Sequence, residues 1–214
     1  MSQADSLLHD SCLPRRHRVG HFTNRELATI AVLAALHFAV SFAARMIGGV
    51  LQVLLGPWAV FVDGLGGEGI PCLLSAVAVT LIPRFGTATL MIVTVWLLNA
   101  VVSGTFSFVS AQQVAVSIIV HEAILLLFLV TVGPWRRRPS RMAAISEIVR
   151  TSLALGVANA TALGVQFYIA INEYKLIFPR YYVEQVTLIT GLGYGALGAA
   201  IGTVWGRSLR RTAP

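Results

Sequence analysis

His121 and Glu122 lie side by side in the apolar run from residue 114 to 132, where an imidazole and a carboxyl could relay protons or bind a small polar ligand. An ionisable residue inside a membrane-length apolar segment is costly and is therefore a candidate functional residue. The pair does not open an HExxH zinc motif, because Leu125 stands where the second histidine would be. Since adjacent helical residues point about 100° apart, we expect Glu122 alone to face the interior. There it either binds a ligand or is a neutral carboxyl held by a neighbouring helix.

A second candidate lies in the glycine-rich segment DGLGGEG, which contains Asp63 and Glu68. Each glycine weakens a helix by about 1 kcal/mol relative to alanine, so we expect a broken helix here. Irregular backbone at membrane depth is tolerated where protein or a water-filled cavity surrounds it, and in transporters such breaks often lie at the substrate site. The alternative is a solvated outer loop.

Other polar side chains share helix faces. Trp96 and Asn99 share one face of a further apolar segment, and Asn159 and Gln166 share a face of another. Amides and hydroxyls either contact a ligand or join membrane helices to one another, and the spacing alone favours neither. The full set of substrate-site candidates is Glu122, Asn99, Trp96, Asp63, Glu68, Asn159, Gln166, Tyr168 and Asn172.

The composition predicts the elements that must position these residues. Of the 214 residues 56% are hydrophobic and 12% charged, and the mean hydropathy is +0.76, which indicates an all-α integral membrane protein. At roughly 20 residues per span, the chain has room for about six helices. We expect a polar, basic head at residues 1–25, a membrane domain at 26–206 and a basic tail at 207–214.

We expect the six spans at residues 27–44, about 57–83, 87–103, 114–132, 151–171 and 186–206, with the second broken by the glycine-rich segment. In this topology only Arg45, Lys175 and Arg180 of the 16 lysines and arginines lie on the far side of the membrane. The asymmetry predicts cytoplasmic amino and carboxyl termini in the cell membrane. A seventh span at residues 46–62 would place the basic carboxyl tail outside and would remove this charge asymmetry.

Small residues recur at a spacing of four, which lets another helix approach closely. In the first span we expect an external partner helix to use this stripe, which consists of Ala31, Ala35 and Ala39. In the last span we expect packing within the chain at Gly191, Gly195, Gly198 and Gly202.

The two cysteines lie in different settings, and no catalytic or metal-binding motif is present. We therefore expect no enzyme activity, no cofactor and no metal site.

The chain resembles a substrate-binding S component of an energy-coupling factor (ECF) vitamin transporter, and is most similar to the thiamin-precursor (hydroxymethylpyrimidine) members, the YkoE type. The resemblance is carried by a basic head that runs into RELATIAVLAAL, by GPWAVFVDGLGG and IPRFGTATL, by the glutamate of HEAILLLFLVT, and by GLGYGALGAAIGTVWGRSL. The arginine-rich head is a departure from the family pattern.

The resemblance implies that the chain captures its vitamin from outside, in a pocket formed by the outer halves of the later spans and the loop after the first span. A transmembrane coupling subunit would meet the alanine stripe, and two cytoplasmic ATPases would drive uptake. The start Met1-Ser2-Gln3 lacks the Met-His segment of the cobalt and nickel members, which disfavours a metal substrate. A pyrimidine could pair with Glu122 and Asn99 and stack on Trp96. The alternative is a stand-alone secondary transporter with Glu122 and His121 as proton relay.

Overall fold

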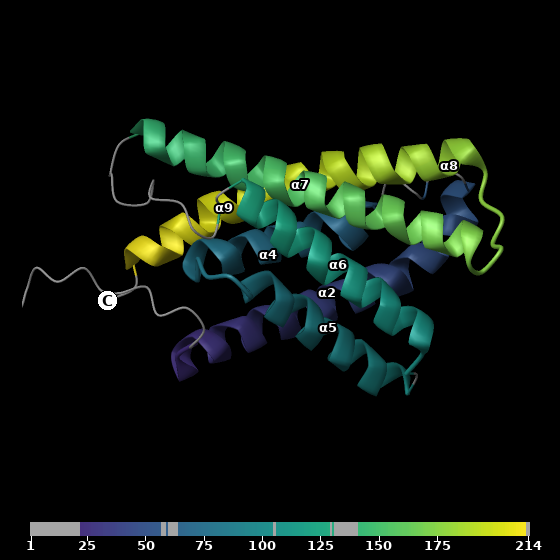
Figure 1. The fold of residues 1–214 in the computed structure, drawn as a ribbon, viewed down its shortest axis with the longest axis horizontal. Coiled ribbons are helices and arrows are strands. Elements are labelled where there is room, and N and C mark those ends of the chain that lie inside the picture. The colour runs from purple at the N-terminus through teal and green to yellow at the C-terminus, as the bar shows by residue number, and fades with distance from the viewer. Residues whose placement is uncertain are drawn as a thin grey trace, which may run out of the picture.

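The computed structural model describes residues 22–56, 59, 64–104, 106–128, 130 and 141–212. Within this part the regular elements are all helices, and they run roughly along the long axis of the molecule (Figure 1). They are α2 (Asn24–Leu55), η2 (Leu65–Gly69), α4 (Ile70–Leu81), α5 (Thr87–Ser103), α6 (Phe108–Leu127), α7 (Arg141–Asn172), α8 (Arg180–Gln185), η4 (Val186–Tyr194) and α9 (Gly195–Thr212). The elements η2 and η4 are π-helices, and η4 joins α8 to α9.

Four helices of the described part are long and apolar enough to cross a membrane: Asn24–Leu55, Phe108–Leu127, Ala144–Asn172 and Arg180–Arg211. The helices Leu65–Leu81 and Thr87–Ser103 are also apolar but shorter, each about 26 Å long at the α-helical rise. The all-α fold is confirmed, and the four long helices suit a membrane protein.

The expected span boundaries are right for one helix and wrong for others. Helix α5 has the predicted bounds, Thr87–Ser103. The first span was expected to end before Arg45, but α2 continues through this residue to Leu55. Gly48 and Gly49 do not interrupt it, because most of their neighbours are good helix formers. Helix α6 lies nearer the amino terminus than the expected 114–132.

The expected break at the glycine-rich segment is not confirmed. Residues 65–69 form the π-helix η2, in which the Ile70 N–H donates to the carbonyl of Leu65, five residues earlier. The chain continues directly into α4. Asp63 lies outside the described residues, as do residues 1–21 of the expected head and the basic residues Arg136–Arg138.

Helix α4 lies at the centre of the bundle, and seven of its twelve residues are buried, including the consecutive run from Ala76 to Thr80. The predicted packing of the last-span glycines within the chain is confirmed, because α9 lies directly against α4. A Cβ atom on Gly198 would be 1.9 Å from the Gly69 carbonyl oxygen, and one on Gly202 would be 2.1 Å from that of Leu73.

The helix ends gather at the two ends of the bundle (Figure 1). We call one the Arg84 end: it contains the start of α2, the loop 82–86 between α4 and α5, and the end of α9. The opposite one, the α8 end, contains the end of α5 and of α7. Both ends of α5 need a left-handed backbone that favours glycine, which Gly86 (φ 91°) and Gly104 (φ 63°) supply.

Candidate functional site

Asn159 joins both π-helices to α7. Its side-chain Nδ2 donates a hydrogen bond to Glu68 Oε2 of η2 at 2.8 Å, and it also donates to the Gly191 carbonyl oxygen of η4 at 3.4 Å. Asn159 itself is buried. We call Glu68, Asn159 and Gly191 the π site, because π-helical turns are rare and occur frequently at functional sites.

Glycines allow the two π-helices to meet at this point. A Cβ atom on Gly64, the residue before η2, would lie 2.4 Å from Thr190 Cγ2 in η4. One on Gly195 would lie 3.4 Å from both Asn159 Nδ2 and Cys72 Sγ. The backbones around the π site are therefore close together, and its polar groups are held by packing on several sides.

The π site lies well inside the bundle. Glu68 precedes the loop at Ile82 by a helical length of about 21 Å, and Asn159 lies near the middle of α7. In the described part of the chain, Glu68 has an amide partner and no ion-pair partner. A carboxyl in such surroundings accepts a proton, or is compensated by a ligand that brings N–H donors or positive charge.

Trp96 and Asn99 lie farther along α5, toward the α8 end. The Trp96 indole Nε1 donates to Ser110 Oγ at 3.4 Å, and its ring packs edge-on against Phe106 with centroids 5.5 Å apart. Asn99 Oδ1 accepts from Arg45 Nη2 at 3.0 Å. These two predicted site residues thus have partners in α2 and in the start of α6.

The remaining candidates of α7 lie apart from these. Gln166 Nε2 donates to Ser117 Oγ of α6 at 2.9 Å. Tyr168 is 67% exposed, and the Asn172 side chain donates to the Tyr168 carbonyl within the same helix. The structure therefore brings Glu68 and Asn159 together and distributes the other candidates over different helix contacts.

Glu122 faces the interior, as expected, but it lies at the Arg84 end. Its Oε1 accepts from the backbone N–H of Gly86 at 3.1 Å, from the N–H of Thr89 at 3.0 Å and from the Thr89 hydroxyl at 2.9 Å. Thr89 and Asn99 are separated by about 15 Å of helix, so no small ligand contacts Glu122 and Asn99 together. The hydrogen bonds hold the Glu122 carboxyl to a neighbouring helix, and ligand binding by Glu122 stays a prediction. The His121 ring instead contacts its own helix, with Nδ1 at 2.8 Å from the Ser117 carbonyl oxygen.

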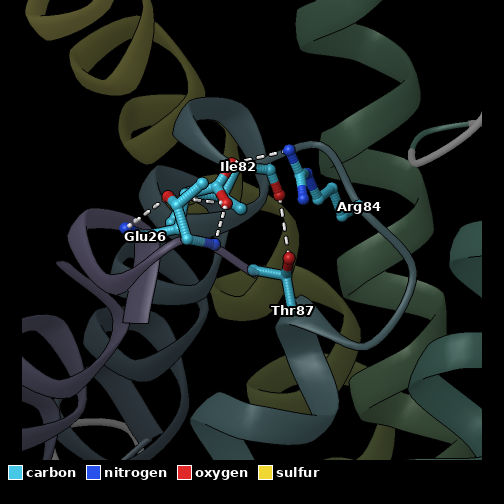
Figure 2. A network of polar contacts seen from close by, with 5 residues as sticks. Glu26, Ile82, Arg84 and Thr87 are labelled. Atoms are coloured by element: carbon cyan, nitrogen blue, oxygen red, sulfur yellow. Dashed lines mark hydrogen bonds and ion pairs between the residues drawn. The ribbon is translucent and has the colours of Figure 1, made fainter. Parts of the chain in front are cut away.

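A second carboxyl-bearing residue, Glu26, contacts the same loop (Figure 2). Arg84 forms an ion pair with Glu26 of α2 at 3.2 Å, and within the loop the Ile82 carbonyl accepts from the Thr87 hydroxyl at 2.9 Å. Glu26 also exchanges hydrogen bonds with Thr23, which completes a capping box at the start of α2. The loop 82–86 is thus fixed to both α2 and α6.

The sequence did not identify a polar face on α2. Within the described part of the chain, His37 Nδ1 and Ser41 Oγ are buried without a hydrogen-bond partner, and Arg45, one turn farther on, donates to Asn99. Their spacing of four was the available signal. Among the residues that the structure describes, no three His, Cys, Asp or Glu side chains are grouped so as to hold a metal ion.

The chain matches no protein-family model, no curated protein and no solved structure.

Proposed function

We propose that the chain is the substrate-binding S component of an ECF-type importer, and that it captures a vitamin or vitamin precursor, thiamin or hydroxymethylpyrimidine, at the π site. Uptake would be driven by two separate cytoplasmic ATPases through a transmembrane coupling subunit. The chain itself would bind and carry its substrate, without catalysing a reaction.

The contact of Glu68 with Asn159 between two π-helices carries this proposal. A carboxylate accepts hydrogen bonds, and an amide both donates and accepts them, so the pair complements the adjacent N–H donors and ring nitrogens of an aminopyrimidine. A cationic thiazolium would gain further from the carboxylate charge. The position inside the bundle, beside irregular helices, is typical of substrate sites in membrane transporters.

The proposal includes six membrane spans, with Leu65–Leu81 and Thr87–Ser103 as the two short ones. It places the Arg84 end in the cytoplasm, because cytoplasmic segments collect arginine and lysine. The cations on the helices and loop of this end include Arg25, Arg84, Arg207, Arg210 and Arg211, whereas Arg45, Lys175 and Arg180 belong to the parts of the chain nearer the α8 end. The π site would then be reached from outside.

The alanine stripe of α2 is the proposed contact for the coupling subunit. Ala31, Ala35 and Ala39 are exposed in the structure, whereas Ile30 and Ala34 of the same helix are buried in the core. Small exposed residues at a spacing of four permit close approach of a second helix in the membrane.

The test is ligand binding by the purified full chain, with mass spectrometry of the small molecules it retains and titration with thiamin and hydroxymethylpyrimidine. Glu68→Gln should weaken binding about ten- to a hundred-fold, since a charge-assisted hydrogen bond contributes about 1.5–3 kcal/mol. Glu173→Gln, a matched change at an exposed position at the end of α7, should leave the affinity unchanged.

Equal affinity of the two variants would contradict the assignment of the π site. Absence of any retained or titrated vitamin would contradict the function itself. Uptake by cells that survives ATP depletion but collapses with the proton gradient would replace the S-component proposal with a proton-coupled secondary transporter.

A further inference from the structure

We propose that Asn159 couples occupancy of the π site to the register of η4: when Glu68 is taken by a ligand, the Asn159 contact is released and η4 converts from a π-helix to an α-helix. The inference rests on the proposed function for its trigger. The coupling itself depends on contacts within the chain and is testable without a ligand.

The length of η4 is unusual, because π-helices mostly occur as single turns within α-helices. It extends over nine residues, Val186–Tyr194, in the middle of a helix that is α-helical on both sides. The α-helical register is thus the near alternative for the same segment. The Thr190 hydroxyl donates to the Val186 carbonyl four residues earlier, which is the acceptor that the Thr190 N–H would use in an α-helix.

Asn159 is positioned to hold η4 in the π register. Its amide bears two N–H donors, and the structure directs one contact to Gly191 in η4 and one to Glu68. Gly191 also fits closely against α7, where a Cβ atom would lie 3.0 Å from Ala160 Cα. Because Asn159 bridges η4 and η2, a ligand that donates to the Glu68 carboxylate competes directly with this bridge.

A change of register in η4 has its effect at the α8 end. Each residue of an α-helix turns the chain by about 100°. A shift of the hydrogen-bond register by one residue therefore turns the part of the helix beyond it by about this angle. The part that would turn carries a shallow open groove of about 220 Å³, lined by Tyr181, Glu184, Gln185, Leu188 and Ile189. It also carries the Tyr182 ring, which stacks on Phe178 with centroids 6.3 Å apart. Ligand capture at the π site would therefore rearrange the surface at the outer end of the same helix.

The experiment measures distances by pulsed EPR between spin labels on the full chain, in a Cys12→Ser, Cys72→Ala background. One pair places labels at Tyr181→Cys in α8 and Phe108→Cys at the start of α6, both exposed. The control pair combines Phe108→Cys with Leu197→Cys in α9, beyond η4 and also exposed. A turn of 100° on a helix of about 11 Å diameter moves a surface side chain by about 8 Å.

Two variants should shift the equilibrium of η4 from the π-helical to the α-helical register without a ligand. Asn159→Ala removes the bridge. Gly193→Ala retains it but favours the α-helix, since alanine is the stronger α-helix former, and its Cβ would meet only the Leu188 carbonyl oxygen at 3.8 Å. Gly49→Ala in α2, where a Cβ atom would have no neighbour within 4 Å among the described residues, is the matched control.

We expect the Tyr181–Phe108 distance to change by up to about 8 Å in Asn159→Ala and Gly193→Ala, while Gly49→Ala and the Leu197 pair stay unchanged. Unchanged distances in both variants would overturn the coupling, and if Asn159→Ala does not fold, Gly193→Ala decides alone. Thiamin or hydroxymethylpyrimidine added to the labelled chain that carries neither Asn159→Ala nor Gly193→Ala should give the same shift. A shift in the variants with no binding of either compound would retain the coupling and contradict the proposed function.

Discussion

Thr89 donates both its backbone N–H and its hydroxyl to the same carboxylate oxygen of Glu122, over 3.0 and 2.9 Å. Thr89 belongs to the first turn of α5, whose backbone N–H groups have no acceptor within the helix. The carboxylate of α6 satisfies them and lies at the positive end of the helix dipole. Glu122 therefore joins two helices, and its second oxygen, Oε2, is buried and has no hydrogen-bond partner among the residues that the structure describes.

We predict that Glu122→Ala lowers the stability of the chain more than its ligand affinity. The change leaves the Gly86 and Thr89 donors without their acceptor, and a buried donor left unsatisfied costs about 1–3 kcal/mol. Glu122→Gln keeps one acceptor oxygen and should lose less. Thermal unfolding of the purified chain in detergent measures the effect.

A double-mutant cycle with Thr89→Ala separates this contact from general damage to the core. The two substitutions should be non-additive, because Thr89→Ala removes the hydroxyl hydrogen bond that Glu122→Ala also removes. Full additivity, or a variant that unfolds normally but binds its ligand poorly, would return Glu122 to the list of substrate-binding residues.

The sequence predicts α5 completely but not α2, and the reasons are local. The apolar run 87–103 is bounded by Gly86 and Gly104, whose left-handed backbone ends the helix at both sides. Arg45 resembles a membrane boundary in the sequence. In the structure the helix continues past it, because its guanidinium finds a partner in Asn99.

The π site could be predicted only in part. Glu68 and Asn159 were both candidates, but they are 91 residues apart in the chain, and no single-sequence pattern pairs residues over that distance. The π register depends on close packing at glycines such as Gly64. Glu122 was expected near the middle of a span, and lies near a helix end because α6 ends at Leu127.

We predict that Gly202→Ala is strongly destabilising. Its Cβ atom would lie 2.1 Å from the Leu73 carbonyl oxygen, which belongs to the backbone of α4 and cannot move without displacing that helix. Overpacking of this kind costs about 1–3 kcal/mol. Gly49→Ala, at an open position, should be neutral or slightly stabilising. Equal thermal unfolding of the two variants would show that α9 does not pack tightly on α4.

We predict that cysteines at Phe85 and Ile177 lie on opposite sides of the membrane, in a background with Cys12→Ser and Cys72→Ala. Both positions are exposed, Phe85 by 57% and Ile177 by 95%, so a maleimide can reach them wherever water does. An impermeant maleimide should label Ile177→Cys in intact cells, and Phe85→Cys only after permeabilisation. Labelling of both in intact cells would contradict six spans with a cytoplasmic Arg84 end.

We predict that Ala35→Trp blocks assembly with the coupling subunit and preserves both the fold and ligand binding. Ala35 is exposed on the outer face of α2, so an indole has room in the free chain but prevents a second helix from approaching closely. Leu36→Trp is the matched control, because Leu36 is exposed by 48% on a neighbouring face and already carries a large side chain. Co-purification of the partner and titration of the ligand are measured for each variant. Normal assembly of Ala35→Trp would remove the stripe as an interface, and equal loss in both variants would assign the contact to a wider face of α2.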